Sequence, residues 1–356
     1  MHKQRKSSRV HFVLYLFLLY FFYVWISADD KEESTTVVDS NRKVVLLAAT
    51  KFFGNSMNEW ISPCTSQKHF CSLTTNSSDP DVAAAIFHNA DFKNQLTEPR
   101  LNVPYVLFSL ESPANDHFRP GKNFINYTMT FRLDSDIPIP YGMFEKLENE
   151  VKIDFEQIWS EKSKNATWVG SNCHAQNGRS ALIKEMQNAG LQVDVWGACG
   201  KPPPICNGVN NQRSDCMMEL IRPYKFYISF ENSNCKHYVT EKFYLSLLNR
   251  DAIPIVMKRK IYEEIGAPNG SYIAMDDFAS VQEAVKFIHE VGSDKGKYLE
   301  YHKWRNHYRI IDAYSAKTGF CKLCDLLQRG ELKPKVYENL QDWNSASINC
   351  DNSKIF

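Results

Sequence analysis

The sequence predicts an α/β protein with two parallel-sheet domains behind an N-terminal membrane helix. Three observations support this prediction. Residues 10–28 are almost entirely apolar. In the second half, short apolar runs alternate with helical segments, which is typical of βαβ units on a parallel sheet. At 356 residues the chain is long enough to bury two separate cores.

The apolar run 10–28 predicts a signal-anchor, because 19 helical residues are long enough to span the hydrocarbon of a bilayer. Four basic residues precede the run and four acidic residues follow it: Lys3, Arg5, Lys6, Arg9, Asp29, Asp30, Glu32 and Glu33. This charge distribution predicts a cytosolic tail at 1–9, a stem at 29–43 and a lumenal body. A signal peptide cleaved near Ala28 is the alternative, but the length of the run and its late aromatic residues favour the anchor.

Sequons and cysteines agree with a lumenal body. Ten cysteines form an even set in a compartment that would oxidise them, and we expect disulfides of unknown connectivity. The alternative to disulfides is a zinc site, because Cys321 and Cys324 have the CxxC spacing of two zinc ligands. No second CxxC pair, and no His pair at ligand spacing, completes such a site. The predicted glycosylation sites are Asn76, Asn126, Asn165 and Asn269.

The net charge of +1 excludes a protein that binds nucleic acid through bulk charge. In the first half, apolar runs predict strands at 44–49, 82–87 and 103–110, with polar, loop-rich sequence between them. These runs indicate an α/β domain over residues 44–160.

The second half has a clearer alternation and forms the predicted domain 161–330, followed by a C-terminal extension at 331–356. A helix that begins at Arg179 is expected to stop at Gly190, and a further helix is expected at 281–289. The predicted strands are 167–170, 191–196, 226–230 and 253–256, and the predicted helices between them are 179–189, 216–221 and 239–248.

Polar residues gather where the strand 226–230 ends and the next helix begins. Ligands of parallel sheets lie beyond the carboxyl ends of the strands, and helix N-termini attract phosphate. Lys242 is able to reach a phosphate, and Glu241 is able to accept hydrogen bonds from ribose hydroxyls. Together the two residues suit a nucleotide. The alternative is a solvated Glu-Lys pair on a surface helix, which the dipeptide alone favours.

A longer motif changes this interpretation. FENSNCKHYVTEKF at 230–243, followed by NRDAIPIVM at 249–257, resembles the signature of the α1,3-fucosyltransferases. The similarity extends from about residue 44 to 345 and is closest to invertebrate and plant-like members. Other blocks that resemble the family are LESP at 110–113, FRLDSDIPIPYG at 131–142, WVGSNCHAQNGR at 168–179 and VDVWGACG at 193–200.

The resemblance implies a single-pass type II Golgi membrane enzyme of the GT-B fold, with two facing Rossmann-like domains. It implies inverting transfer of L-fucose from GDP-β-L-fucose to a GlcNAc hydroxyl of a glycoprotein glycan, at the N-glycan core or in a Lewis-type antenna. The matching residues imply that Glu111 is the base and that Arg179 contacts the phosphates. The residues implied to hold the nucleotide sugar are Asn232, Tyr238, Glu241 and Lys242.

Inverting transfer needs a base for the acceptor hydroxyl and positive charge for the departing diphosphate. Without the resemblance, Glu111 would be interpreted as a loop glutamate before Pro113. Arg179 and Lys242 supply the positive charge, so no cofactor is required and a divalent cation (Mn or Mg) is expected at most to stimulate. Asp134 and Asp136 superficially resemble a metal-binding DxD, but we expect a turn there.

Two positions depart from the family pattern. His237 stands where an acidic residue commonly precedes the motif tyrosine, and Lys258 stands where relatives have a small glycine. A cation at 258 would crowd the donor pocket or add a phosphate contact. The alternative function is therefore an inactive family member that binds glycan or GDP and acts as a partner of active transferases.

Overall fold

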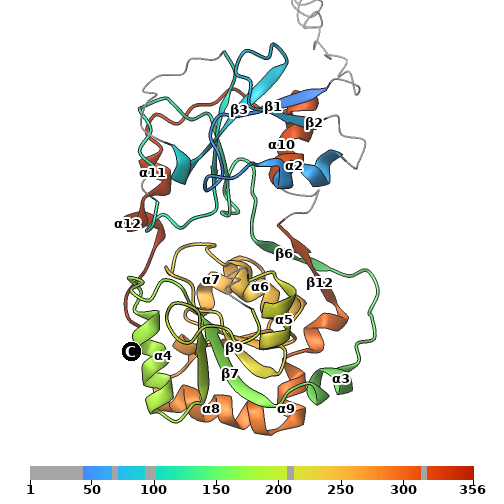
Figure 1. The fold of residues 1–356 in the computed structure, drawn as a ribbon, viewed down its shortest axis with the longest axis vertical. Helices are drawn as coiled ribbons and strands as arrows, with labels where there is room; N and C mark the ends of the chain where they lie inside the picture. The colour runs from blue at the N-terminus through green and yellow to red at the C-terminus, as the bar shows by residue number, and fades with distance from the viewer. Residues whose placement is uncertain (1–42, 66–70, 93–101, 117, 207–211, 314–318) are drawn as a thin grey trace, which may run out of the picture. The chain divides into compact units, whose positions relative to one another are not determined.

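The structure is a computed structural model that describes residues 43–65, 71–92, 102–116, 118–206, 212–313 and 319–356. Two five-stranded sheets, each parallel throughout, organise these residues (Figure 1). In spatial order the first sheet is β2 (Cys71–Thr74), β1 (Val44–Ala48), β3 (Val82–His88), β4 (Tyr105–Ser109) and β5 (Tyr127–Thr130). The second is β11 (Ile273–Ala274), β10 (Ile253–Val256), β9 (Tyr224–Ile228), β7 (Lys164–Val169) and β8 (Val193–Trp196).

The first sheet is covered on both faces, which explains why its three central strands β1, β3 and β4 are mainly apolar. In β4 all five residues are buried, with Val106 and Phe108 in one core cluster and Tyr105 and Leu107 in another. The strands predicted at 44–49, 82–87 and 103–110 are confirmed as β1, β3 and β4.

The second sheet follows the predicted alternation of strands and helices. The helices that follow its strands are α4 (Arg179–Asn188), α5 (Asp215–Ile221), α6 (Glu241–Leu248) and α7 (Arg259–Glu264). Helix α8 (Val281–Ser293) packs its apolar stripe against the same core, together with α3 (Phe155–Ser160) and α9 (Lys295–Glu300). The α/β class and the parallel sheets are confirmed, and every strand and helix expected in this half is present.

Several elements lie outside the expectation. Strand β6 (Gly142–Lys146) pairs antiparallel with β12 (Tyr308–Asp312) to form a small third sheet. The remaining elements are the helices α2 (Asn58–Thr65), α10 (Gly319–Gln328), α11 (Gln341–Asn344) and α12 (Ala346–Asn349), and the 3-10 turns Asn89–Asp91, Met275–Asp277 and Lys303–Asn306.

Helix α10 belongs by sequence to the predicted segment 161–330 but lies beside α2 and the first sheet (Figure 1). Disulfides join Cys64 to Cys321 and Cys71 to Cys324. All ten cysteines are paired, so the disulfide prediction is confirmed over the zinc alternative. The other pairs are Cys173–Cys199, Cys206–Cys216 and Cys235–Cys350.

The predicted anchor at 10–28, with its tail and most of its stem, lies outside the described residues. Within the described ranges, none of the helices has the length and apolar character needed to cross a bilayer.

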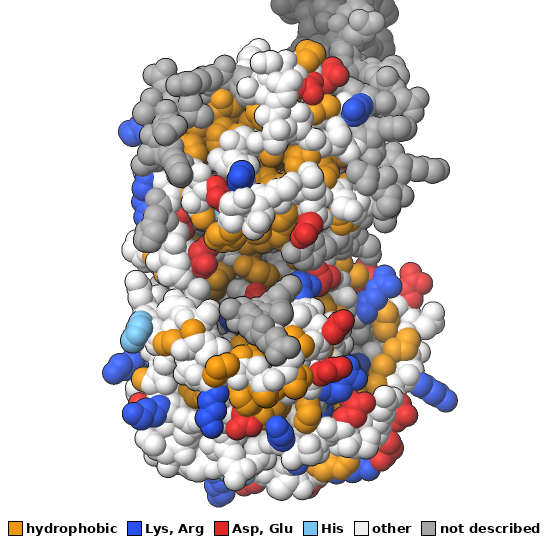
Figure 2. All heavy atoms as spheres, viewed as in Figure 1, with side chains coloured by type: hydrophobic (Ala, Val, Ile, Leu, Met, Phe, Trp, Pro, Cys, Tyr) orange, Lys and Arg blue, Asp and Glu red, His pale blue; other side chains and the backbone are white. Residues whose placement is uncertain are grey.

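Basic and acidic side chains intermix over the face shown in Figure 2.

Candidate active site

Glu111 lies just beyond the carboxyl end of β4, and residues from the loop after β9 hold its carboxylate. Its Oε1 atom accepts hydrogen bonds from the Tyr238 hydroxyl at 2.9 Å and from the Asn232 amide at 3.4 Å. The Ser112 backbone N–H, at 2.8 Å, and the Asn115 amide, at 3.4 Å, donate to the same atom. Since four donors fix Oε1, the orientation of the carboxylate depends on both sheets.

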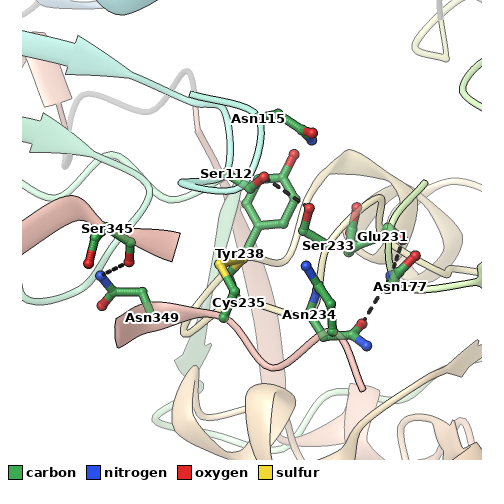
Figure 3. The surroundings of a disulfide bond; sticks show 12 residues. Ser112, Asn115, Asn177, Glu231, Ser233, Asn234, Cys235, Tyr238, Ser345 and Asn349 are labelled. Carbon is green, nitrogen blue, oxygen red and sulfur yellow. Dashed lines mark hydrogen bonds between the residues drawn. A yellow bond between two sulfur atoms is a disulfide. The ribbon is translucent and has the colours of Figure 1, made fainter. Parts of the chain in front are cut away.

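Tyr238 links the loop 231–238 to the first sheet. Its side chain is buried in the same core cluster as Val106 and Phe108 of β4, and its ring contacts Phe131 edge-on with centroids 5.0 Å apart. Burial raises the pKa of Tyr238 well above its ordinary value, and the Glu111 carboxylate adds to this effect. Tyr238 therefore remains a hydrogen-bond donor at neutral pH. A second polar link joins Ser112 Oγ to Ser233 Oγ at 3.1 Å (Figure 3).

Lys242 lies between two carboxylates at the start of α6. Its Nζ is 3.3 Å from Glu231 Oε2 and 3.1 Å from Glu241 Oε1, and it donates to Thr240 Oγ1 at 2.8 Å. Glu231, which is only 4% exposed, also accepts from the Thr240 backbone N–H at 2.7 Å. The four side chains therefore form one connected network at the carboxyl end of the second sheet.

The network stabilises the charged form of Lys242. Burial alone would lower the pKa of Lys242, but the charges of Glu231 and Glu241 outweigh burial and raise it. Burial raises the pKa of Glu231. For Glu241, burial would raise the pKa, but Lys242 outweighs burial and lowers it. Lys242 is thus a fixed cation whose charge is already shared by two acidic groups.

Arg179 begins α4 and is 3% exposed. Its guanidinium donates to the carbonyl oxygens of Phe230 and Asn172, each at 2.9 Å. Its Nε has no hydrogen-bond partner among the described residues, and no carboxylate in that part of the chain lies within ion-pair distance. Burial lowers the pKa of Arg179. The charges of Glu231 and Glu111 oppose this effect without pairing directly with Arg179, so an anion bound to the guanidinium would stabilise it further.

Glu111 and Glu241 both line a cleft of about 350 Å³. Four aromatic side chains form much of its wall: Phe52, Phe53, Trp60 and Tyr141. The other lining residues are Leu110, Gln212, Arg213 and Ala313. Carboxylates beside aromatic surfaces suit a ligand with both hydroxyl groups and apolar C–H faces, as a sugar has.

Phe53 is presented to this cleft by a tight turn after β1. Its side chain is 56% exposed and its backbone has a φ of 47°, which a bulky residue rarely adopts. The Asp91 carboxylate accepts the backbone N–H groups of Phe53 at 2.5 Å and Gly54 at 2.9 Å. Asp91 in turn bonds His88 Nδ1 at 2.6 Å. The Phe53 ring also contacts the rings of Phe52 and His88, with centroids 4.9 and 4.6 Å away.

The two departures from the family pattern have structural explanations. His237 has a φ of 58°, and its Nδ1 accepts the Leu133 backbone N–H at 3.2 Å. Burial lowers the pKa of His237, which keeps this nitrogen available as an acceptor. Lys258 pairs with Asp351 and donates to Ser353 Oγ at 3.0 Å. Neither side chain is among the residues that line the cleft beside Glu111.

The carboxylates of the DxD-like segment are engaged by protein groups. Arg132 donates to Asp134 through Nε at 2.8 Å and Nη2 at 2.7 Å, and these bonds lower the pKa of Asp134. Asp136 accepts from Lys335 at 2.5 Å and from the Thr128 backbone N–H at 2.9 Å. These contacts give both residues a structural role.

The predicted sequons differ in their surroundings. Asn76 and Asn269 are exposed, and Asn165 donates to Gln192 at 3.0 Å. The Asn126 amide donates to the Lys335 carbonyl at 2.8 Å and accepts the Tyr105 backbone N–H at 2.8 Å. Glycosylation at all four stays a prediction.

The structure brings Glu111, Asn232 and Tyr238 into one hydrogen-bonded group, with Glu241 and Lys242 in a second group. Glu231 lies inside the FENSNCKHYVTEKF motif, but the sequence did not identify it as the buried partner of Lys242. Asp91 and His88 were also missed, since only the pairing of β3 beside β1 brings them to the turn at Phe53. The only indication in the sequence that His88 and Asp91 could interact was their separation by three residues.

Comparisons with known proteins agree with the motifs. Residues 40–142 match the family model described as "Fucosyltransferase, N-terminal", and residues 159–343 match "Glycosyltransferase family 10 (fucosyltransferase) C-term". The chain is 46% identical to Alpha-(1,3)-fucosyltransferase fut-6 of Caenorhabditis elegans, over 86% of this chain and 81% of that protein. It is 38% identical to Alpha-(1,3)-fucosyltransferase fut-5 of the same organism, over 86% and 83%.

A solved structure also has a similar fold. It is described as an α1,3-fucosyltransferase with GDP-fucose, and it covers 82% of this chain and 90% of its own, with a TM-score of 0.53 at 17% identity.

Proposed function

Because the chain belongs to the α1,3-fucosyltransferase family, glycosyltransferase family 10, we propose that it transfers L-fucose from GDP-β-L-fucose to a GlcNAc of a glycoprotein glycan. The proposed linkage is α1,3 and the reaction inverts the donor anomeric centre. The proposal includes a GT-B arrangement of two Rossmann-like domains and a Golgi-lumenal location behind an anchor at 10–28.

One observation carries the proposal: the carboxylate of Glu111, which follows a strand of the first sheet, is held by two motif residues from a loop of the second sheet. Glu111 Oε1 is fixed by Tyr238 and Asn232, whereas Oε2 has no hydrogen-bond partner in the part of the chain that the structure describes. In the proposed reaction Oε2 removes the proton of the acceptor hydroxyl. The acceptor oxygen then attacks C1 of fucose, and GDP departs with the electron pair of the broken bond.

The proposed donor site is the carboxyl end of the second sheet. Arg179 is a buried cation without a carboxylate partner among the described residues, and the diphosphate of GDP would supply the missing negative charge. The Oδ1 atom of Asn232 is buried and unpartnered, so it is able to accept a hydroxyl of the donor. With Lys242 nearby, protein cations meet the charge of the leaving group, and the proposal requires no metal.

The proposed acceptor site is the aromatic cleft of about 350 Å³ that contains Glu111. Its aromatic side chains suit the C–H faces of a pyranose ring, and Glu111 on its wall would meet the hydroxyl that reacts.

The proposal is tested by incubating the purified lumenal body with GDP-fucose and a panel of core and antennary N-glycans. We expect GDP release that depends on the acceptor, and a product heavier by one fucose in mass spectrometry. Glu111→Gln should lower kcat at least about a hundredfold while the Kd for GDP stays unchanged, because the base is lost and the donor contacts remain.

Unchanged turnover in Glu111→Gln would remove Glu111 as the base. GDP binding without transfer to any glycan, in the parent protein, would instead support the inactive family member that binds partners.

A further inference from the structure

The last residues of the chain are bonded to the loop that carries Asn232 and Tyr238. Residues 345–356, named here the C-terminal strap, run antiparallel to Asn234–Lys236 at the bridge between Cys235 and Cys350. The Asp351 N–H donates to the Asn234 carbonyl, and the Lys236 N–H donates to the Asn349 carbonyl, each at 2.8 Å. Figure 3 shows Cys235 beside Tyr238, with Ser345 and Asn349 of the strap on one side.

A side chain of the strap completes this pairing. The Asn234 backbone N–H donates to Asn352 Oδ1 at 2.8 Å, and a disulfide joins Cys235 to Cys350. Buried backbone groups need hydrogen-bond partners, and both Asn234 and Cys235 are buried although no helix or strand contains them. The strap therefore supplies the bonds that a sheet neighbour would give to a strand.

Both ends of the strap are attached to the body. Asn344, just before it, donates to Asp116 Oδ2 at 2.9 Å, and the adjacent Trp343 ring lies 4.0 Å from the guanidinium of Arg132. At the other end, Ile355 packs against the core of the second sheet. Lys258 pairs with Asp351 midway. Because the strap is anchored at both of its ends, it is able to fix the position of the loop 231–238 to which its middle is bonded.

We propose that the C-terminal strap is a positioning element that holds the loop 231–238 so that Asn232 and Tyr238 orient the Glu111 carboxylate. This inference rests on the proposed function. The strap lies beyond residue 343, where the family-model match ends, and it gives Lys258 its partner. Asn352, Asp351 and Cys350 act through the loop and do not touch the proposed substrates.

The first test removes the side-chain oxygen of Asn352, which accepts a hydrogen bond from the loop. Asn352→Ala removes the bond to the Asn234 N–H, whereas Asn352→Asp keeps an oxygen that accepts it. We expect Asn352→Ala to lower kcat about five- to tenfold with the acceptor KM changed less than about twofold, since binding of the acceptor uses other residues. Asn352→Asp should restore kcat. Lys354→Ala, an exposed change on the same strap, should match the parent.

The second test removes the covalent link. Cys235→Ser with Cys350→Ser is compared with Cys71→Ser with Cys324→Ser, which also loses one disulfide but leaves the neighbouring Cys64–Cys321 bond. Both variants are assayed well below their thermal midpoints. We expect the first pair to lower kcat more than the second, and to raise hydrogen exchange of the backbone amides in 231–238.

Parent-like kcat in both Asn352→Ala and the Cys235/Cys350 variant, with an active parent protein, would overturn the strap proposal. If the parent transfers no fucose, the proposed function fails, and hydrogen exchange still decides the strap: unchanged exchange at 231–238 in Asn352→Ala refutes it.

Discussion

The charge on Lys242 is balanced within the protein before any ligand arrives. Two carboxylates, Glu231 and Glu241, lie within 3.3 Å of its Nζ, so the three groups together carry one negative charge. Removing one partner of a buried ion pair leaves the other charge unpaired, which is expensive. A simple alanine variant of Lys242 therefore measures stability and nucleotide binding at the same time.

A double substitution separates these two roles. Lys242→Ala should lower the free energy of unfolding by about 3 kcal/mol, because Glu231 is left buried and unpaired. Adding Glu231→Gln removes that charge and returns the site to one negative charge, so stability should recover. If Lys242 contacts the nucleotide, the affinity for GDP should stay about tenfold weaker in the double variant, as calorimetry would measure.

Full recovery of GDP affinity in the double variant would contradict a direct contact. Lys242 would then be a structural residue that keeps Glu231 and Thr240 in place at the start of α6.

At the scale of elements, the turn between β1 and α2 shapes the proposed acceptor cleft. The turn places Phe53 in a left-handed backbone conformation and leaves the residue 56% exposed. Asp91, from the 3-10 turn after β3, fixes it through two backbone N–H groups. The exposed ring is thus held by a neighbouring strand connection as well as by its own chain segment.

We expect Phe53→Ala to raise the acceptor KM about tenfold, because a stacked sugar would lose its aromatic contact, whereas the KM for GDP-fucose should not change. Phe53→Tyr keeps the ring and serves as the matched control. Equal acceptor KM values for Phe53→Ala and the parent would exclude Phe53 from the acceptor site.

The sequence was most informative where one short segment determines its own structure. Most strands and helices from 164 to 293 follow from apolar periodicity, because each βαβ unit forms locally, whereas the short elements α7 and β11 were not predicted. Strands β6 and β12 are short and pair across more than 160 residues, so no local pattern marks them. The motif residues Glu111, Asn232 and Tyr238 were identified by resemblance, but their shared hydrogen bonds required the fold.

The strap and the Asp91 contact were beyond prediction for the same reason. In each, backbone groups of one segment are satisfied by a remote segment, and neither segment has a distinctive composition.

At the scale of the whole molecule, buried histidines should make stability depend on pH. His302 is 1% exposed, its Nδ1 accepts from Arg305, and burial with the charges of Arg305 and Lys162 holds its pKa well below the ordinary value. The folded pKa is thus below the unfolded value of about 6.5, so the unfolded state binds the proton first and stability falls as pH drops through that region.

We expect the thermal midpoint of the parent to fall between pH 7 and pH 5, and His302→Gln to reduce this fall, since glutamine does not titrate. Protonation of His302 in the unfolded state can lower the free energy of unfolding by about 1.4 kcal/mol for each pH unit below 6.5, and this loss is absent in His302→Gln. Scanning fluorimetry at matched ionic strength measures it. Identical pH profiles for the two proteins would show that His302 is protonated equally in the folded and unfolded states.

The cover of the first sheet has a consequence for biosynthesis. Strands β1 and β3 are among the earliest elements made, yet one face packs against α10 and the other against Leu340 and its neighbours. The two disulfides to α10 span 257 and 253 residues. Because a ribosome delivers the N-terminus first, this half lacks the cover of α10 and Leu340, and cannot form these two disulfides, until residues 319–340 have been made. The sheet that is made first therefore gains its last covering residues only after the second sheet has been made.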